Sequence, residues 1–351
     1  MLNLKSNLNQ FIPLKNKYMK MSHAKKSILT SGIVLLGALL MYSCNKSNST
    51  PSGPKPPSNP GGYDSANQVA SANLVAYWSF NNTLTESKQN LSGTNYGSSF
   101  TTGGNGMASQ GSPSGYVVYP NPGTALPVLT SFTLSFWIDA SQPINNPTAN
   151  IVPGEGAQGL FDLVNNAGFW ANLHVDLEPF TSYSSSSTTP NTDTLSLKME
   201  MTCTAQGVLW GNQFPTVWLD TAVGKWTQVV LTYNGASGTF TSYENGTITG
   251  TNSLGYAYGP YNGSATFYAS DPGSATNTKS APILGNLLFA NATALVLGTW
   301  QLSTTPSMTS SATAQPWATS YTGAMDELRV YNSALNASDV KSLYILEKGG
   351  F

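Results

Sequence analysis

YTGAMDELRVYNSALNASDVKSLY, residues 321–344, is the stretch that decides the fold. Its first half is rich in apolar and aromatic residues, which predicts a β-strand. In its second half, Asn336 can cap a helix, and Asp339 stands where a carboxylate helps to hold the start of that helix. Val340 and Leu343 then fall on one helical face. The stretch therefore predicts a strand followed by one short helix.

Further blocks upstream carry strand signals. An apolar run with aromatic residues spans 74–80, and a second strong run spans 226–233. A third strand pattern follows and ends at Asn245-Gly246, a pair that suits the positive φ angles of a type I′ hairpin turn. From about residue 72 to 333 such runs alternate with Gly, Pro, Asn and Ser, which predicts an all-β domain.

Together these blocks resemble the LamG-like (laminin-G/pentraxin) domains of the concanavalin A-like lectin/glucanase superfamily. Those domains often end with a glycine, an Asp-Glu pair, an arginine and a Tyr-Asn pair in the order seen at 323–332. The resemblance implies a two-sheet antiparallel jelly-roll β-sandwich with one short C-terminal helix and with neighbouring first and last strands. It covers 74–346 in scattered blocks and speaks to fold, because function depends on local sites.

The N-terminal region has the order of a secretory signal. Lysines 25 and 26 precede an apolar run over 28–41, which at ~14 residues is short for a membrane-spanning helix. The run ends before Cys44 and resembles the signal of a bacterial (Bacteroidota-like) lipoprotein in which Cys44 is lipidated. We predict a signal peptide over 1–43, which starts at Met1 or alternatively at Met19 or Met21. Ordinary secretion without lipidation is the alternative.

Residues that follow Cys44 have the composition of a tether. Five prolines lie among Ser, Asn and Gly between residues 45 and 62, and such a segment cannot bury a core. We predict a lipidated cysteine and tether over 44–71 and the jelly-roll domain over 72–351. The protein would be exported and anchored by lipid to the outer membrane, on the cell surface or on the periplasmic side.

Charge and cysteine content limit the partners. Six of the 15 basic residues and none of the 16 acidic residues precede Cys44, so the chain from Cys44 onward has nine bases and a net charge of −7. Nucleic-acid binding needs clustered basic residues and is therefore not expected. Cys203 alternates with apolar residues and is expected in the core. His174 is the single histidine after Cys44, which excludes a multi-histidine zinc site.

The strongest candidate ligand site lies on two consecutive strand patterns. In residues 169–178 the odd positions are apolar, which places the even positions on the other face of the strand. The next strand pattern, 195–203, adds its own polar face. If the two strands pair, these faces merge into one with an aromatic ring, amides and carboxylates, as sugar recognition uses. The predicted ligand residues are Trp170, Asn172, His174, Asp176, Glu178, Lys198 and Glu200. A solvated sheet face with Lys–Glu pairs is the alternative.

Catalysis at this face is the second possibility. Asp176 and Glu178 are close enough along the strand to form a carboxylate pair of the kind glycosidases use. The Glu-x-Asp-x-x-Glu pattern of laminarinase-like members of the superfamily is absent, as are the Arg-rich and Gln-x-His patterns of its alginate-lyase-like members. We therefore assign no catalytic residue from the sequence.

One structural Ca²⁺ is a further expectation from the resemblance. Many members of the superfamily hold this ion between the first and last strands, and Asp326 and Asn81 occupy matching positions. Calcium takes six to eight oxygen ligands, which one carboxylate and several carbonyls can supply. The alternative is that Asp326 pairs with Arg329 or accepts hydrogen bonds from backbone amides.

The function expected from the sequence is non-catalytic binding of a polysaccharide or glycoprotein by a surface-anchored lipoprotein. A divergent glycan-cleaving enzyme, either a glycoside hydrolase or a lyase, is one alternative. A purely structural or adhesive domain is the other. The membrane would be reached through the lipid anchor alone.

Overall fold

Two β-sheets face each other, and the apolar residues that alternate along their strands fill the space between them. The computed structural model describes residues 54–141, 156–179, 193–205, 208–213, 216–250, 262–269 and 282–351. Cys44 and the predicted signal peptide lie outside these residues, so the signal and the lipidation stay predictions. In the described part of the chain the strands pair antiparallel, except that β18 runs parallel to β7.

Among the described residues, the first sheet has nine strands and runs in the order β14-β13-β12-β6-β19-β4-β3, with β1 on β19 and β15 on β13. Its strands are β1 (Leu74–Trp78), β3 (Ser99–Thr102), β4 (Met107–Gln110), β6 (Phe132–Asp139), β12 (Thr227–Asn234), β13 (Thr239–Glu244), β14 (Thr247–Ile248), β15 (Ser264–Thr266) and β19 (Ala324–Tyr331).

The second sheet has ten strands within the described ranges, in the order β10-β9-β8-β7-β17-β5-β2, with β11 and β16 on β9 and β18 on β7. Its strands are β2 (Thr94–Tyr96), β5 (Tyr116–Tyr119), β7 (Ala157–Asn165), β8 (Leu173–Glu178), β9 (Leu195–Ala205), β10 (Val208–Gln213), β11 (Val217–Leu219), β16 (Leu287–Leu288), β17 (Ala292–Leu297) and β18 (Ala318–Ser320). Short 3-10 helices are η1 (Ala66–Gln68), η2 (Ser71–Asn73) and η3 (Leu126–Val128), and the described α-helix is α1 (Ala337–Gly349).

The core lies between the two sheets. Phe136 of β6 and Leu231 of β12 belong to the same buried cluster as Val175 of β8 and Leu197 of β9. Cys203 is also part of this cluster and is a free thiol, as expected from its apolar neighbours in the sequence. The all-β, two-sheet sandwich with a C-terminal helix confirms the predicted fold class.

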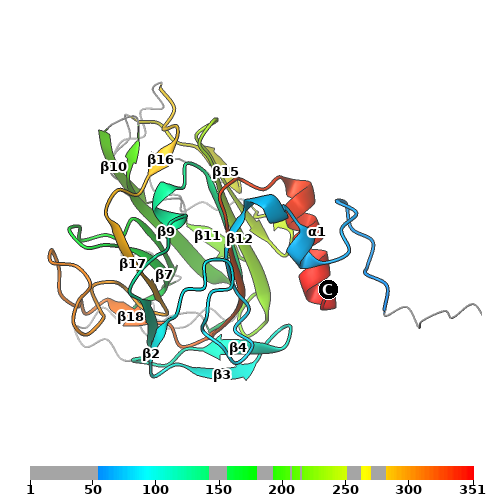
Figure 1. Ribbon diagram of the computed structural model, residues 1–351, viewed down its shortest axis with the longest axis horizontal. Coiled ribbons are helices and arrows are strands. Elements are labelled where there is room, and N and C mark those ends of the chain that lie inside the picture. The colour runs from blue at the N-terminus through cyan, green and yellow to red at the C-terminus, as the bar shows by residue number, and fades with distance from the viewer. Residues whose placement is uncertain are drawn as a thin grey trace, which may run out of the picture. The chain divides into compact units, whose positions relative to one another are not determined.

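The closing strand and helix form as the opening stretch predicts. β19 pairs with β1, and Leu328 lies opposite Trp78, so the first and last strands are neighbours. The side chain of Asn336 accepts a hydrogen bond from the Asp339 amide at 2.9 Å and caps α1. The buried face of α1 packs on the outer side of the first sheet in a second apolar cluster, and Figure 1 shows α1 in red beside that sheet.

The folded unit begins earlier than the predicted boundary at residue 72. Ala66 and Val69 are buried against α1, and the Gly61 amide donates to Ser342 Oγ at 2.8 Å. The Tyr63 hydroxyl also donates to Asp339 at 2.8 Å. The C-terminal part of the predicted tether is therefore packed on the domain, because its few apolar side chains complete the cluster around the helix. Within the described residues, no helix combines the length and the apolar character that a membrane crossing needs.

Candidate functional site

The predicted ligand face does form across β8 and β9. His174 lies opposite Glu200, and Asp176 lies opposite Lys198 in an antiparallel register. The polar faces of the two strands therefore merge, as the alternation in the sequence implies. We call the set Asn172, His174, Asp176, Glu178, Lys198 and Glu200 the His174 face.

The His174 face is buried, whereas both sequence interpretations presuppose an accessible face. Each of its six side chains belongs to a residue less than 9% exposed. Trp300 stacks on the His174 imidazole with 3.7 Å between ring centroids, and the Gln301 amide donates to Asp162. Lys198 Nζ bonds Glu178 Oε1 at 2.6 Å and lies 3.5 Å from Glu200. Ligand binding at the His174 face stays a prediction, and within the described residues this face has no open surface.

Burial and ion pairing set the charges of this face. Burial on its own would lower the pKa of His174, but the Asp162 carboxylate at Nδ1 and the Asp176 carboxylate at Nε2 together outweigh it and raise that pKa to about 10. The pKa of Glu200 is raised to about 7 by burial, against the opposing attraction of Lys198. The face is therefore a buried network of ion pairs. These pairs link β8 to β7 through Asp162 and to β9 through Lys198.

Trp170, the remaining predicted ligand residue, lies at the surface. It is 36% exposed and packs against other aromatic rings, with Trp317 at 5.9 Å and Trp300 at 6.2 Å between ring centroids. Trp170, Trp300 and Trp317 thus pack on each other. Trp170 remains an accessible ring, separated by Trp300 from the buried His174 face.

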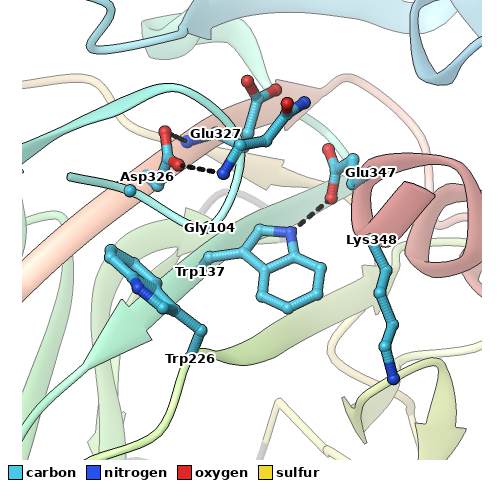
Figure 2. Close-up of a pocket in the computed structure, with 9 residues that line it drawn as sticks. Gly104, Trp137, Trp226, Asp326, Glu327, Glu347 and Lys348 are labelled. Carbon is cyan, nitrogen blue, oxygen red and sulfur yellow. Dashed lines mark hydrogen bonds between the residues drawn. The ribbon is translucent and has the colours of Figure 1, made fainter. Parts of the chain in front are cut away.

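An open cavity lies on the other sheet, beside α1. It measures about 280 Å³ and is lined by Gly103, Gly104, Asn105, Trp137, Trp226, Asp326, Glu327, Glu347 and Lys348. We call it the Trp137 cavity. Figure 2 shows two indole rings, Trp137 and Trp226, below the carboxylates of Asp326 and Glu347. Two aromatic rings opposite a polar wall form a site that suits an amphipathic ligand.

A β-bulge in β19 builds the polar wall. Asp326 pairs with Trp137, but Arg329 already pairs with Ser135, so β19 has one residue more than β6 over this interval. Glu327 takes up the extra residue with a φ of 50°. Consecutive strand residues normally point to opposite faces, yet here Asp326 and Glu327 both line the cavity while Leu328 enters the core. The bulge thus places two adjacent carboxylates on one face.

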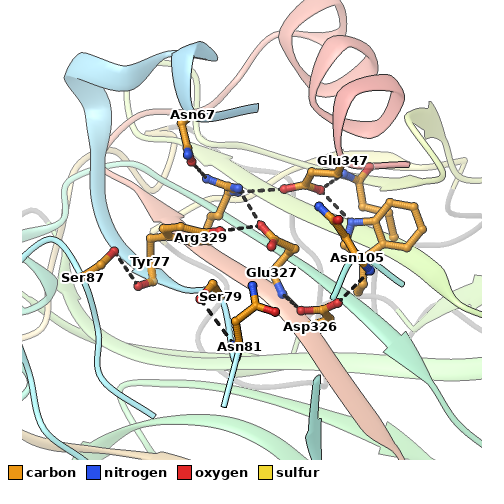
Figure 3. Close-up of polar contacts among 12 residues, drawn as sticks. Asn67, Tyr77, Ser79, Asn81, Ser87, Asn105, Asp326, Glu327, Arg329 and Glu347 are labelled. Carbon is orange, nitrogen blue, oxygen red and sulfur yellow. Dashed lines mark hydrogen bonds and ion pairs between the residues drawn. The ribbon is translucent and has the colours of Figure 1, made fainter. Parts of the chain in front are cut away.

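Arg329 holds these carboxylates in place behind the wall. Its Nη2 bonds Glu327 Oε2 at 2.6 Å, and its Nε bonds Glu347 Oε1 at 2.7 Å. Its guanidinium lies 3.9 Å from the centroid of the Tyr77 ring, and Nη1 donates to Asn67 Oδ1 at 2.8 Å. Figure 3 shows that the network joins β1, β19, α1 and the segment before β1. Buried, charge-assisted hydrogen bonds from one guanidinium to two carboxylates fix the cavity wall rigidly.

Two further donors bind the second oxygen of Glu347. Glu347 Oε2 accepts from Trp137 Nε1 at 2.7 Å and from Gln228 Nε2 at 2.8 Å. Burial raises the pKa of Glu327 to about 7, although Arg329 opposes the shift, and burial raises the pKa of Asp326 to about 6. Near neutral pH the wall therefore carries acidic groups that are partly protonated.

The predicted calcium ligands do not fit a calcium ion in this arrangement. Asp326 accepts hydrogen bonds from the backbone amides of Glu327 at 2.9 Å and Asn105 at 3.2 Å. Asn81 Oδ1 accepts from the Met107 amide at 2.8 Å. The partial positive charges of these amide N–H groups therefore face the oxygens that would have to bind a calcium ion. Of the sequence alternatives for Asp326, hydrogen bonding by backbone amides is the one seen, while Arg329 pairs with Glu327 and Glu347 instead.

Sequence reasoning missed Trp137 and Trp226 as site residues. Neither residue is distinguished by its own strand pattern, because their partners in the cavity come from the β3–β4 loop, β19 and α1. One signal for the wall is present in the sequence. The core residues of the closing strand, Met325, Leu328 and Val330, are spaced by three and then by two, and a three-residue step in an alternating strand indicates a bulge.

No family model and no curated protein matches the chain. Among solved structures it is similar to domain 4 of AbnA, a GH43 extracellular arabinanase from Geobacillus stearothermophilus, in complex with arabinotriose, with a TM-score of 0.41, 18% identity and coverage of 77% of this chain and 98% of that one. It is also similar to the botulinum neurotoxin type G receptor binding domain, with a TM-score of 0.42, 9% identity and coverage of 78% and 50%. A botulinum neurotoxin DC binding domain in complex with SialylT gives a TM-score of 0.42, 12% identity and coverage of 79% and 52%. The chain thus spans about half the length of the two neurotoxin domains, and at these TM-scores the likeness carries no argument about the site.

Proposed function

We propose that this protein binds glycans without cleaving them, and that the Trp137 cavity is where it binds. The observation that carries the proposal is the pair of tryptophan side chains in one cavity with a fixed polar wall. Sugar rings have apolar C–H faces and polar hydroxyl edges, so they match an indole ring on one side and carboxylates or amides on the other. A free polysaccharide and the glycan of a glycoprotein offer the same chemistry to such a site.

Binding without cleavage is the better match to the wall. Glycoside hydrolysis needs one carboxyl group free to give a proton and a second free to attack or to activate water. Here both oxygens of Asp326 and both oxygens of Glu347 accept hydrogen bonds within the protein. Glu327 Oε2 is likewise bonded to Arg329 and to the Tyr77 hydroxyl. Carboxylates held in this way fix a surface, so we do not assign them a catalytic role.

The LamG-like membership and the lipid anchor belong to the proposal as well. A lipidated Cys44 would keep the glycan-binding domain at the outer membrane, on its outer or periplasmic side. The direct check is fractionation of cells that express the full chain. Cys44→Ala should move the protein from the membrane to the soluble fraction, and unchanged membrane association would contradict the anchor.

The glycan proposal is tested by a matched pair of tryptophan variants. Calorimetric titration of neutral oligosaccharides from β-1,4-glucan, β-1,4-xylan and α-1,5-arabinan should show binding to the intact protein. Trp226→Ala should weaken that binding at least about tenfold, which equals about 1.4 kcal/mol. Trp170→Ala removes the accessible ring of the sequence-predicted site and should leave affinity unchanged. The reverse result would transfer binding to the Trp170 side, and no binding of any oligosaccharide would remove the proposed function.

A further inference from the structure

A second cavity adjoins the Trp137 cavity. It also measures about 280 Å³ and is lined by Thr101, Thr102, Gln110, Asp139, Ala140, Ser141, Gly224, Trp226, Thr322, Gly323 and Ala324. We call it the Asp139 cavity. Trp226 lines both cavities, and it is the residue that their linings share.

The strand register shows why the two cavities are neighbours. Asp326 pairs with Trp137 in the first cavity, and Ala324 pairs with Asp139 in the second. These pairs are two residues apart along β19 and β6, a spacing of ~6.6–7 Å on the same face of the sheet. The β3–β4 segment also passes from one cavity to the other, because residues 101–102 line the Asp139 cavity and residues 103–105 line the Trp137 cavity.

Size also favours a joint site. Ligand pockets in proteins commonly measure ~300–1,000 Å³, and each cavity alone falls just short of that range. The two together reach it. Trp226 is half-buried, and its ring packs close to the backbone of Gly104, where an added Cβ would lie 3.6 Å away. A ring held in this way can contact a ligand from both sides of the boundary.

The charged side chains of the two linings limit the class of ligand that fits. The two linings contain four acidic side chains, Asp139, Asp326, Glu327 and Glu347, and one basic side chain, Lys348. Lys348 is exposed, and its Nζ donates to the Tyr344 hydroxyl at 3.0 Å, while Arg329 behind the wall pairs with two of the acids. Acidic sugars such as uronic acids would meet like charge along this surface.

We infer that the Trp137 and Asp139 cavities are adjoining subsites of one groove, divided by Trp226, that takes at least two successive sugar residues of an uncharged or amine-bearing glycan chain. The inference rests on the proposed function and adds the length and the charge class of the ligand. Hydroxyl groups of the second sugar would meet Thr101, Thr102 and the Asp139 carboxyl, which are among the polar side chains on that side of Trp226.

A chain-length series tests the inference. Calorimetry with mono-, di-, tri- and tetrasaccharides of β-1,4-glucan, β-1,4-xylan, α-1,5-arabinan and β-1,4-glucosamine should show an affinity gain of at least about tenfold from one residue to two in a series that binds. Oligogalacturonate of the same length should bind at least tenfold more weakly.

Thr102→Phe fills the edge of the Asp139 cavity at an exposed position, and Thr94→Phe is its control at an exposed position of β2 in the other sheet. The first variant should abolish the gain from the second sugar and keep the affinity for one residue, whereas the control should keep both.

Monosaccharides that bind as tightly as tetrasaccharides, or a length gain that survives Thr102→Phe, would overturn the two-subsite inference while the proposed function stands. Oligogalacturonate that binds as tightly as the neutral chains would overturn the charge class. Failure of every sugar to bind would refute the proposed function and this inference with it.

Discussion

Replacing Arg329 with methionine should separate the effect of charge from the effect of packing in the cavity wall. Arg329 is 1% exposed and makes bonds of 2.6 and 2.7 Å to Glu327 and Glu347. Methionine keeps much of the side-chain volume but leaves two buried carboxylates without their cation. Removing one partner of a buried ion pair commonly costs ~3–5 kcal/mol, and we expect a loss in that range from urea unfolding at pH 8.

The pH dependence of this loss identifies its cause. The pKa of Glu327 is already raised to about 7 by burial, and Arg329 is the group that opposes the rise. Without Arg329 the pKa of Glu327 moves higher, so at pH 5 the Glu327 carboxyl is protonated and one of the two unpaired charges is gone. The loss from Arg329→Met should therefore be clearly smaller at pH 5 than at pH 8. An equal loss at both pH values would refute the electrostatic account and assign the effect to packing.

A double variant provides the matched control. Glu327→Gln keeps an acceptor for the Tyr77 hydroxyl and removes one of the two charges. In that background Arg329→Met should cost less than in the intact protein, by ~0.5–3 kcal/mol, which is the usual range for residues in direct contact. Additive losses would show that Arg329 and Glu327 act independently, contrary to the geometry.

Three further predictions concern the stability of other parts of the molecule. Since the carboxylates of Asp162 and Asp176 outweigh burial and raise the folded-state pKa of His174 from 6.5 to about 10, the contribution of that proton to stability is complete below pH 6.5 and is lost as the pH rises through 10. Asp162→Asn should flatten that part of a pH–stability profile, and an unchanged slope would contradict the assignment. Asn336→Ala removes the cap of α1 and should lower the free energy of unfolding by about 1 kcal/mol in urea, whereas an unchanged midpoint would show that the cap is dispensable. Millimolar calcium added to EDTA-treated protein should move the melting temperature by no more than about 1 °C, because the oxygens of Asp326 already accept amide hydrogens. A rise of several degrees would instead support the calcium site predicted from the sequence.

Local sequence signals predict the closing elements of this fold well. Asn336 caps α1, and Asn245-Gly246 adopts φ angles of 50° and 73°, as a type I′ turn requires. The pairing of the first and last strands also follows the resemblance. Each of these features depends on neighbours in the sequence or on a pattern that recurs in related folds.

The candidate site could not be predicted in the same way. Alternation shows that the His174 face points away from the sandwich core, but it does not show what covers that face. The cover includes Trp300 and Gln301, which come from a segment more than a hundred residues later in the chain. Trp137 and Trp226 could not be recognised as site residues, because their strand patterns are ordinary. They become site residues only where β19, α1 and the β3–β4 loop complete the cavity around them.

The position of the cavity in the chain has a consequence for folding. Asn105 and Asp326, which meet in its wall, are 221 residues apart, and Trp137 and Glu347 are 210 residues apart. Contacts between such distant residues form late and slowly, because a long loop must close before they stabilise the chain. The site therefore exists only after β19 has entered the first sheet and α1 has docked. Sugar binding would then stabilise only the fully closed domain, and a nascent or partly unfolded chain would have no affinity for the ligand.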